Sequence, residues 1–313
     1  MAENGNWERD VLEKLVFASL KEQRKSRNWG IFFKALGFAY LTLFLVLLFA
    51  GGGGHGEKLA VGSRHSAVVE LNGIIASGKP ASAENINESL RDAFADKHTK
   101  GVILRINSPG GSPVQAGQIH DEIRRLRAKH PSVPVYAVVE DVCASGGYYA
   151  AVAADRIFVD KASLIGSIGV LMDGFGFTGA MEKLGVERRL LTAGANKGFM
   201  DPFSPMNPEQ REHAQKMLGD IHQQFIQVVR SGRGKRLRED EQTFSGLIWS
   251  GEQGIRLGLA DNYGSVDSVA RDVIKADVLV DFTKQENFTE RLAKGLGAGA
   301  MANVLQGLGG SFR

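Results

Sequence analysis

The sequence predicts an α/β domain with a mainly parallel sheet, preceded by one N-terminal transmembrane helix. The apolar run over residues 31–50 predicts the transmembrane helix, and strand-like and helix-like segments alternate from residue 66 onward. Segment 101–107, GVILRIN, is apolar without a break, which is typical of a strand buried on both faces. With 43% hydrophobic and 23% charged residues, the 313-residue chain can bury a core, and its net charge of +3 does not indicate nucleic-acid binding.

The run over 31–50 is long enough to cross a membrane, since about 20 helical residues span roughly 30 Å of hydrocarbon. Its only charge is Lys34, near its start, where the amine can reach the interface. Four basic residues lie within the ten positions before it, namely Lys21, Arg24, Lys25 and Arg27. Because basic residues stay on the cytoplasmic side, we expect the N-terminus inside and the bulk of the chain outside. A cleaved signal sequence is the alternative, although Leu48 stands where a cut after Ala50 needs a small residue.

Composition divides the chain into five parts: a cytoplasmic segment (1–30), the transmembrane anchor (31–50), a Gly-rich linker (51–65), a folded domain (66–283) and a C-terminal tail (284–313). In the folded domain we expect strands near 66–75, 101–107, 134–140, 155–160, 186–193 and 278–282. We expect helices near 82–96, 113–129, 145–154, 207–231 and 251–257. Either Ser82 or Asn85 is expected to cap the first of these helices.

Two junctions between a strand and a helix carry residues suited to chemistry. The first is the SPGGS loop, where Gly110 and Gly111 follow a strand and leave backbone N–H groups open. Such groups suit an oxyanion hole, and they would also suit a phosphate or a thioester carbonyl. An ordinary glycine turn explains the same residues equally well.

Ser145 marks the second junction, because it follows the strand near 134–140 and starts a helix rich in small residues. A nucleophile at this position has an oxyanion donor in the N–H of its own neighbour, Gly146. The alternative is that Ser145 only caps the helix. Cys143 lies two residues earlier, and we expect it to be a buried small residue rather than a nucleophile.

A serine nucleophile needs a base, and the histidines are poorly placed to supply one. None of the seven lies between residues 131 and 212, so a Ser-His-Asp triad is weakly supported. Lysine is the other candidate base, and Lys197 lies among small and apolar residues. Its pKa would have to fall by roughly 2–3 units for it to act near neutral pH, which burial can achieve. The alternative is a solvated loop lysine.

Five motifs in order, INSPGG, SGGYYAA, GSIGV, NKGFMDPFSPMNPEQR and WSGEQGIRLGLAD, resemble the bacterial signal peptide peptidases of the S49 family of serine proteases. The resemblance covers about residues 66–275. It implies a ClpP/crotonase-like domain and a catalytic Ser-Lys dyad, with Ser145 as nucleophile and Lys197 as general base. It further implies that Ser167, the serine of GSIGV, orients Lys197. The oxyanion donors would be the N–H groups of Gly146 and Gly111, the latter favoured over Gly110.

The expected function is a membrane-anchored serine endopeptidase that degrades cleaved signal peptides and other apolar peptides. The resemblance also implies a homo-oligomer in the bacterial inner membrane, with the catalytic domain on the periplasmic side. No metal or nucleotide motif is present, so we expect no cofactor and no nucleic-acid partner. Two alternatives remain: a crotonase-type enzyme acting on acyl-CoA thioesters, and an inactive scaffold that binds membrane proteins.

Overall fold

The computed structural model describes residues 4–51 and 63–284, and the chain divides into two units, residues 1–57 and 58–313. Helix α1 (Asn4–Gly51) occupies the first unit without a break between the predicted cytoplasmic and membrane segments. Among the described residues, none of the helices combines the length and apolarity that a membrane crossing needs. The transmembrane anchor predicted over 31–50 is thus not shown by the structure. The C-terminal tail and most of the linker lie outside the described residues.

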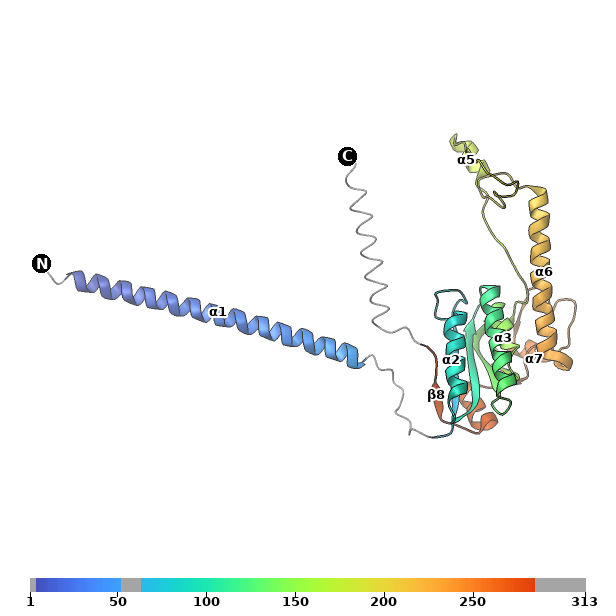
Figure 1. Ribbon diagram of the computed structural model, residues 1–313, viewed down its shortest axis with the longest axis horizontal. Helices are drawn as coiled ribbons and strands as arrows, with labels where there is room; N and C mark the ends of the chain where they lie inside the picture. Colours follow the sequence, from blue (N-terminus) through green and yellow to red (C-terminus); the bar gives the residue numbers. More distant parts are fainter. Residues whose placement is uncertain (1–3, 52–62, 285–313) are drawn as a thin grey trace. The chain divides into compact units, whose positions relative to one another are not determined.

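An eight-stranded sheet organises the second unit, and it confirms the prediction of a mainly parallel α/β domain (Figure 1). The strand order is β6-β5-β3-β2-β1-β8, with β4 beside β3 and β7 beside β4. The strands are β1 (His65–Asn72), β2 (Thr99–Ser108), β3 (Val135–Ala144), β4 (Arg156–Val159), β5 (Leu164–Gly166), β6 (Ile248–Ser250), β7 (Asn262–Tyr263) and β8 (Leu279–Asp281). Among the strand pairs that the structure describes, β5 and β6 are antiparallel and the others are parallel.

Strand β3 is longer than predicted, and its length positions the site. Its first half pairs with β4, from Tyr136 to Val138. Its last residues pair in parallel with β5, so that Ala144 lies opposite Gly166. The residues that follow both strand ends therefore emerge side by side at the carboxyl-terminal edge of the sheet, where α/β proteins usually place their sites.

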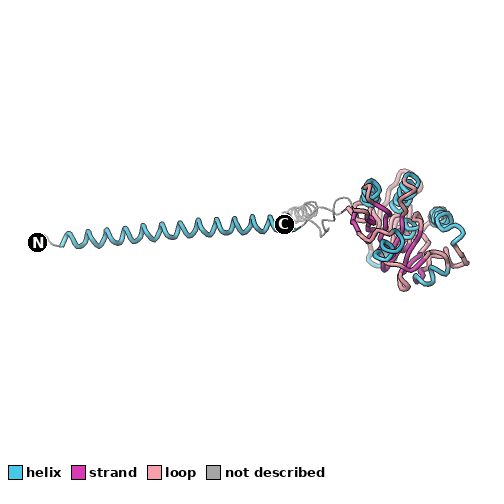
Figure 2. The backbone as a smooth tube through the Cα atoms, turned by 90° about the horizontal axis from the view of Figure 1, so that it is seen from below, coloured by secondary structure: helices cyan, strands magenta, loops and turns pink. Residues whose placement is uncertain are grey.

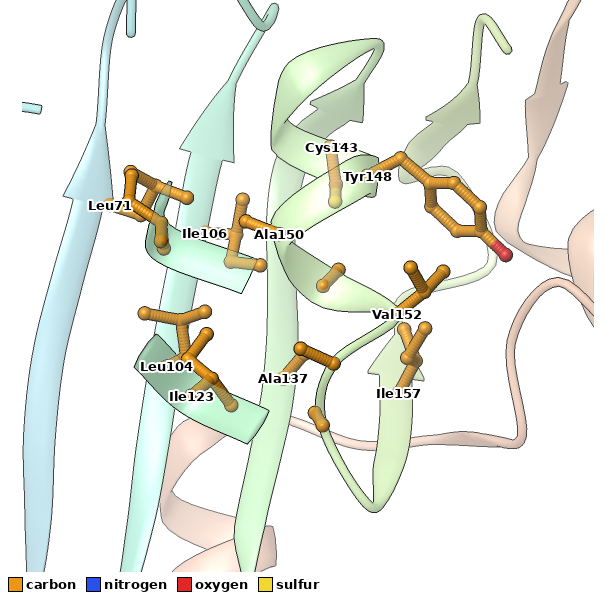
Figure 3. Packing of buried hydrophobic residues seen from close by; sticks show 14 of the residues in the cluster. Leu71, Leu104, Ile106, Ile123, Ala137, Cys143, Tyr148, Ala150, Val152 and Ile157 are labelled. Carbon is orange, nitrogen blue, oxygen red and sulfur yellow. The ribbon is translucent and has the colours of Figure 1, made fainter. Parts of the chain in front are cut away.

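One face of the sheet is covered by helices α2 (Ala83–Ala95), α3 (Pro113–Lys129), α4 (Gly146–Ala151) and α6 (Pro208–Arg233), whose buried residues belong to one core cluster. Figure 1 shows α2 and α3 side by side on the sheet, and Figure 2 shows helices packed against the strands. Helix α2 begins at the predicted cap, where the Ser82 hydroxyl accepts a hydrogen bond from the Asn85 N–H. The strands contribute every second residue to this core, for example Leu104 and Ile106, both fully buried (Figure 3). Two-residue periodicity places these side chains on one face.

The opposite face is covered by α8 (Val266–Ser268) and the π-helical turn η2 (Val269–Ile274). Here Ile103, Val138 and Phe158 form a second, smaller cluster with the buried residues of η2. Because both faces are covered, β2 and β3 can be apolar at almost every position. This explains the unbroken GVILRIN run.

The strand predicted near 186–193 is wrong. That stretch belongs to an extended arm, residues 171–206, which projects from the domain and carries the short helix α5 (Thr178–Leu184). No residue of α5 is buried, and Leu191 is 96% exposed. The apolar residues of VERRLLTA have strand propensity, but none of the strands within residues 63–284 pairs with them. The short helices η1 (Gly234–Arg236) and α7 (Gly251–Arg256) follow the arm and α6.

Candidate functional site

Ser145 connects β3 to α4 in a strained conformation, with φ 50° and ψ −121°. Its carbonyl accepts a hydrogen bond from the Tyr149 N–H, but its hydroxyl makes no capping hydrogen bond to the helix. The structure therefore contradicts the alternative that Ser145 only caps the helix. Non-glycine residues with positive φ cost about 1–3 kcal/mol and concentrate at functional sites. The hydroxyl is left available for chemistry.

The SPGGS loop is fixed beside Ser145 by its own hydrogen bonds. The Ser108 hydroxyl donates to the Gly73 carbonyl at 2.6 Å and accepts from the Gly110 N–H at 3.1 Å. Gly110 and Gly111 have φ values of 96° and 147°, which side-chain-bearing residues rarely adopt. A Cβ at Gly111 would lie 2.2 Å from the Ile75 carbonyl oxygen. The positive φ values and the close contacts that a Cβ would make therefore require glycine at both positions.

Two backbone donors at this junction have no acceptor within residues 63–284. The Gly146 N–H begins α4, and no hydrogen bond from it is made to any described residue. The Gly111 N–H is likewise unpaired there, whereas the Gly110 N–H is held by Ser108. An ideal Cβ on Gly146 would lie 3.3 Å from the Gly111 nitrogen, so the two donors are neighbours. An anion could be bound between them.

Ser167 lies beside Ser145, because each serine directly follows one of a pair of adjacent parallel strands. It shares the φ of 50°, and its N–H donates to the Leu247 carbonyl at 2.8 Å. The Ser145 N–H in turn donates to the Gly166 carbonyl at 2.9 Å. Sequence reasoning found Ser167 only through the resemblance, since 22 residues separate it from Ser145. The long β3 brings the two serines together.

Lys197 does not meet Ser145 within one chain. It is an exposed residue of the arm, and no hydrogen bond links it to Ser145 in the described part of the chain. Its neighbour Asn196 accepts a hydrogen bond from Gln210 in the first turn of α6, whereas His222, further along α6, contacts Ile168 beside Ser167. At about 1.5 Å per residue, these two points on α6 are roughly 18 Å apart.

The side chains around Ser145 hold the junction in place. Cys143 is fully buried in the core shown in Figure 3, and burial raises the pKa of its thiol, which agrees with the expectation of a small core residue. Tyr148 is also buried, and its hydroxyl donates to the Leu259 carbonyl at 2.7 Å. His120 packs edge-on against Tyr149, and burial lowers its pKa. No histidine makes a hydrogen bond with Ser145 in the described residues.

His222 is the contact at this site that sequence reasoning missed. Its Nε2 lies 3.0 Å from the Ile168 carbonyl oxygen, in the turn that follows Ser167. The sequence places His222 in a helix and gives it no indicated role. Because 54 residues separate the partners, no local pattern could have indicated this contact.

Comparison with known proteins identifies the family. The model of peptidase family S49 matches residues 127–280. A protein of Enterococcus faecium with the provisional name signal peptide peptidase SppA is 31% identical over 237 residues, which are 72% of this chain and 68% of that protein. The chain belongs to peptidase family S49. The S49 match contains Ser145, Ser167 and Lys197, while Gly111 precedes it.

The chain is also similar to two other known proteins. A Na(+)/H(+) antiporter NhaA of Brucella melitensis is 43% identical over 209 residues, or 65% of this chain. The chain spans only 28% of the length of that relative. Among solved structures, a mutant ClpP1 from Listeria monocytogenes aligns with a TM-score of 0.40 at 16% identity, covering 63% of this chain and 91% of that chain.

Proposed function

We propose that this S49 family member is a serine endopeptidase with Ser145 as its nucleophile. The observation that carries the proposal is the arrangement at the end of β3. Ser145 has a strained backbone and a hydroxyl that makes no capping hydrogen bond, and it lies next to the N–H groups of Gly146 and Gly111, which are unpaired within residues 63–284. A tetrahedral oxyanion needs two such donors beside the attacking oxygen, each worth about 3 kcal/mol to the transition state. An acyl-CoA enzyme could use the same donors, but the family assignment favours peptide bonds.

In the proposed mechanism, Lys197 in its neutral form accepts the proton of Ser145 as the hydroxyl oxygen attacks the scissile carbonyl. The N–H groups of Gly146 and Gly111 stabilise the oxyanion. Lys197 then gives the proton to the leaving amine, and the carbonyl remains as an ester on Ser145. Lys197 then takes a proton from a water molecule, whose oxygen attacks the ester carbonyl. As the bond from that carbonyl to the Ser145 oxygen breaks, Lys197 returns the proton to the Ser145 oxygen. Ser167 would orient the Lys197 amine through its hydroxyl.

This mechanism requires Lys197 to reach a Ser145 hydroxyl that is distant from it in the single chain. We propose that a second copy of the chain supplies Lys197, so that the active enzyme is a homo-oligomer. The arm that carries Lys197 supports this, because it exposes large apolar side chains that a partner could cover. Among them are Leu171, Phe175, Leu184 and Leu191, each at least 77% exposed. Burying such residues would contribute about 25 cal/mol for each Å² removed from water.

We also propose that α1 anchors the enzyme in the bacterial inner membrane, with the N-terminus cytoplasmic and the catalytic domain periplasmic. Large apolar side chains such as Ile31, Phe38 and Leu43 are more than half exposed along the helix. Apolar exposure on this scale is typical of a surface that contacts lipid or a partner. An anchored protease would meet apolar peptides released into the membrane, and we therefore propose cleaved signal peptides as substrates.

The anchor is tested by fractionating cells that produce the full chain. We expect the protein in the membrane fraction after a carbonate wash, and we expect protease added to spheroplasts to digest the catalytic domain. A variant lacking residues 31–50 should move to the soluble fraction. If the full chain is released by carbonate, or is protected in spheroplasts, the proposed anchoring or orientation is wrong.

Activity is tested with a fluorophosphonate probe, which labels activated serines, and with casein hydrolysis by the detergent-solubilised full chain. We expect labelling and hydrolysis by the wild type and neither by Ser145→Ala. The exposed Ser245→Ala serves as the matched control and should behave as the wild type does. Hydrolysis that persists in Ser145→Ala would exclude Ser145 as the nucleophile. An inert wild type would favour the alternative of a scaffold.

A further inference from the structure

A single turn, residues 166–169, links the two serines of the proposed site. The Gly166 carbonyl accepts the hydrogen bond from the Ser145 N–H at 2.9 Å, and Ser167 follows immediately. The Ser167 carbonyl in turn accepts from the Gly169 N–H at 2.9 Å. Any displacement of this turn therefore moves the backbone of the nucleophile and the hydroxyl of Ser167 together.

Each side of the turn is in contact with a different element. Strand β6 and the residue before it lie on one side. The Leu247 carbonyl accepts a hydrogen bond from the Ser167 N–H, and the Trp249 indole of β6 packs against Gly166. An ideal Cβ on Gly166 would be only 2.8 Å from the Trp249 ring. The side chain of Ile168, within the turn, is fully buried in the main hydrophobic core. A further contact comes from α6, where Nε2 of His222 lies 3.0 Å from the Ile168 carbonyl oxygen.

The contact from His222 has a defined chemistry. A carbonyl oxygen can only accept, so Nε2 of His222 must carry the proton and donate to Ile168. The imidazole is therefore held in one orientation while its ring bridges α6 and the turn. Helix α6 does not depend on this bond for its own packing, since Phe225, Ile226 and Val229 anchor it in the core.

We propose that His222 is a positioning residue for catalysis: by donating to the Ile168 carbonyl, it holds the 166–169 turn so that Ser145 and Ser167 keep their strained conformations. Positive φ at a serine persists only where surrounding contacts impose it. The bond to His222 is the contact that ties the turn to α6, the same helix whose first turn supports the loop of Lys197. The inference rests on the proposed peptidase function and adds a residue to it.

Three variants of the full chain separate positioning from mere stability. His222→Leu removes the donor, and His222→Gln supplies an amide N–H at a similar reach. Gln223→Leu changes the adjacent exposed residue and is the matched control. For each we would measure the rate at which a fluorophosphonate labels Ser145, kcat and KM for a peptide, and Tm.

We expect His222→Leu to slow labelling and lower kcat by on the order of 10-fold to 100-fold, as small misplacements of reacting groups do. KM and Tm should change little, His222→Gln should recover most of the rate, and Gln223→Leu should match the wild type. If His222→Leu labels as fast as the wild type, or if His222→Gln is as slow as His222→Leu, the inference is overturned. Should His222→Leu fail to fold, the labelling rate of His222→Gln tests the inference: a rate close to that of the wild type supports it, and a rate at least 10-fold lower overturns it. A wild type that is not labelled would instead overturn the proposed function and, with it, this inference.

Discussion

Ser145 and Ser167 are a matched pair at the residue level. Each follows the last residue of a strand, each has φ 50°, and the two strands are neighbours in parallel register. Two strained serines would cost about 2–6 kcal/mol together, which a protein keeps only where the geometry is used. The Ser145 hydroxyl makes no capping hydrogen bond to α4, although serine at the start of a helix commonly makes one.

The unpaired N–H of Gly111 gives a prediction at the same scale. In Gly111→Ala the new Cβ would lie 2.2 Å from the Ile75 carbonyl oxygen, so the loop must move and its N–H will point elsewhere. We expect kcat to fall by on the order of 10²-fold to 10³-fold, as for loss of one oxyanion donor. Peptide hydrolysis under saturating substrate measures this.

Gly117→Ala is the control for that substitution, because a Cβ there meets nothing within 4 Å and the residue is helical. It should keep full activity and raise stability by up to about 1 kcal/mol. Full activity in Gly111→Ala would mean that its N–H has no part in the reaction.

At the scale of elements, a charge cluster joins α2 to α3. Glu122 is buried, and it accepts hydrogen bonds from Arg125 at 2.7 Å and from Arg91 at 2.6 Å. The Arg125 guanidinium, and then Arg91, lower the pKa of the Glu122 carboxyl from its ordinary 4.5 to about 2, against the opposing effect of burial. The hydrogen bond from Arg91 of α2 to Glu122 of α3 holds the two helices together. The first turn of α3 follows Gly111.

This lowered pKa predicts how stability depends on pH. Because the carboxylate is favoured in the folded state, its contribution is complete above pH 4.5 and is lost as the pH falls toward about 2. Glu122→Gln should lower the free energy of unfolding at pH 7 by about 1–2 kcal/mol, since both arginines are about half exposed. Urea titrations from pH 7 to pH 2.5 measure the difference.

We expect the difference between wild type and Glu122→Gln to shrink as the pH falls below 4.5. The exposed Glu212→Gln is the control and should leave stability unchanged at every pH. A difference that stays constant with pH would show that packing, and not the charge of Glu122, stabilises the contact between the helices.

For the whole molecule, the arm separates the proposed base from the proposed nucleophile. Residues 171–206 leave the sheet after β5 and return to it through the 26 residues of α6. This excursion carries Lys197 away from its own Ser145. It exposes apolar surface that the described part of the chain does not cover. An active enzyme in which Lys197 acts therefore needs a second chain or a rearranged arm.

Mixing two inactive variants distinguishes these possibilities. Ser145→Ala and Lys197→Ala should each be inactive, losing on the order of 10³-fold or more in kcat. If a second copy supplies Lys197, co-producing the two variants restores activity, because each intact Ser145 can meet an intact Lys197. Peptide hydrolysis by the co-purified mixture measures this, with Lys183→Ala as the active control from the same arm.

If the mixture stays inactive while mixed oligomers form, Lys197 must act within its own chain through a rearranged arm. If Lys197→Ala alone is active, Lys197 is not the base. Lys197→Arg should not restore activity to the single variant, because a guanidinium does not lose its proton near neutral pH.

The sequence by itself determined the longer helices and strands of the folded domain and one half of the site. Apolar periodicity, the Ser82 cap and paired glycines are local signals, so β2, α2 and the Ser145 junction were predicted from the residues that form them. The strand predicted over 186–193 failed because strand propensity does not supply a neighbouring strand. Local patterns report burial and turns, and they carry no information about partners.

Only the tertiary structure decided which distant residues meet. The register between β3 and β5 brought Ser167 to Ser145, and the packing of α6 brought His222 to Ile168 across 54 residues. It also kept Lys197 on the arm, away from Ser145 in the same chain. The physical reason is that strand register and helix position are set by the whole core at once, whereas each motif is set by its own few residues.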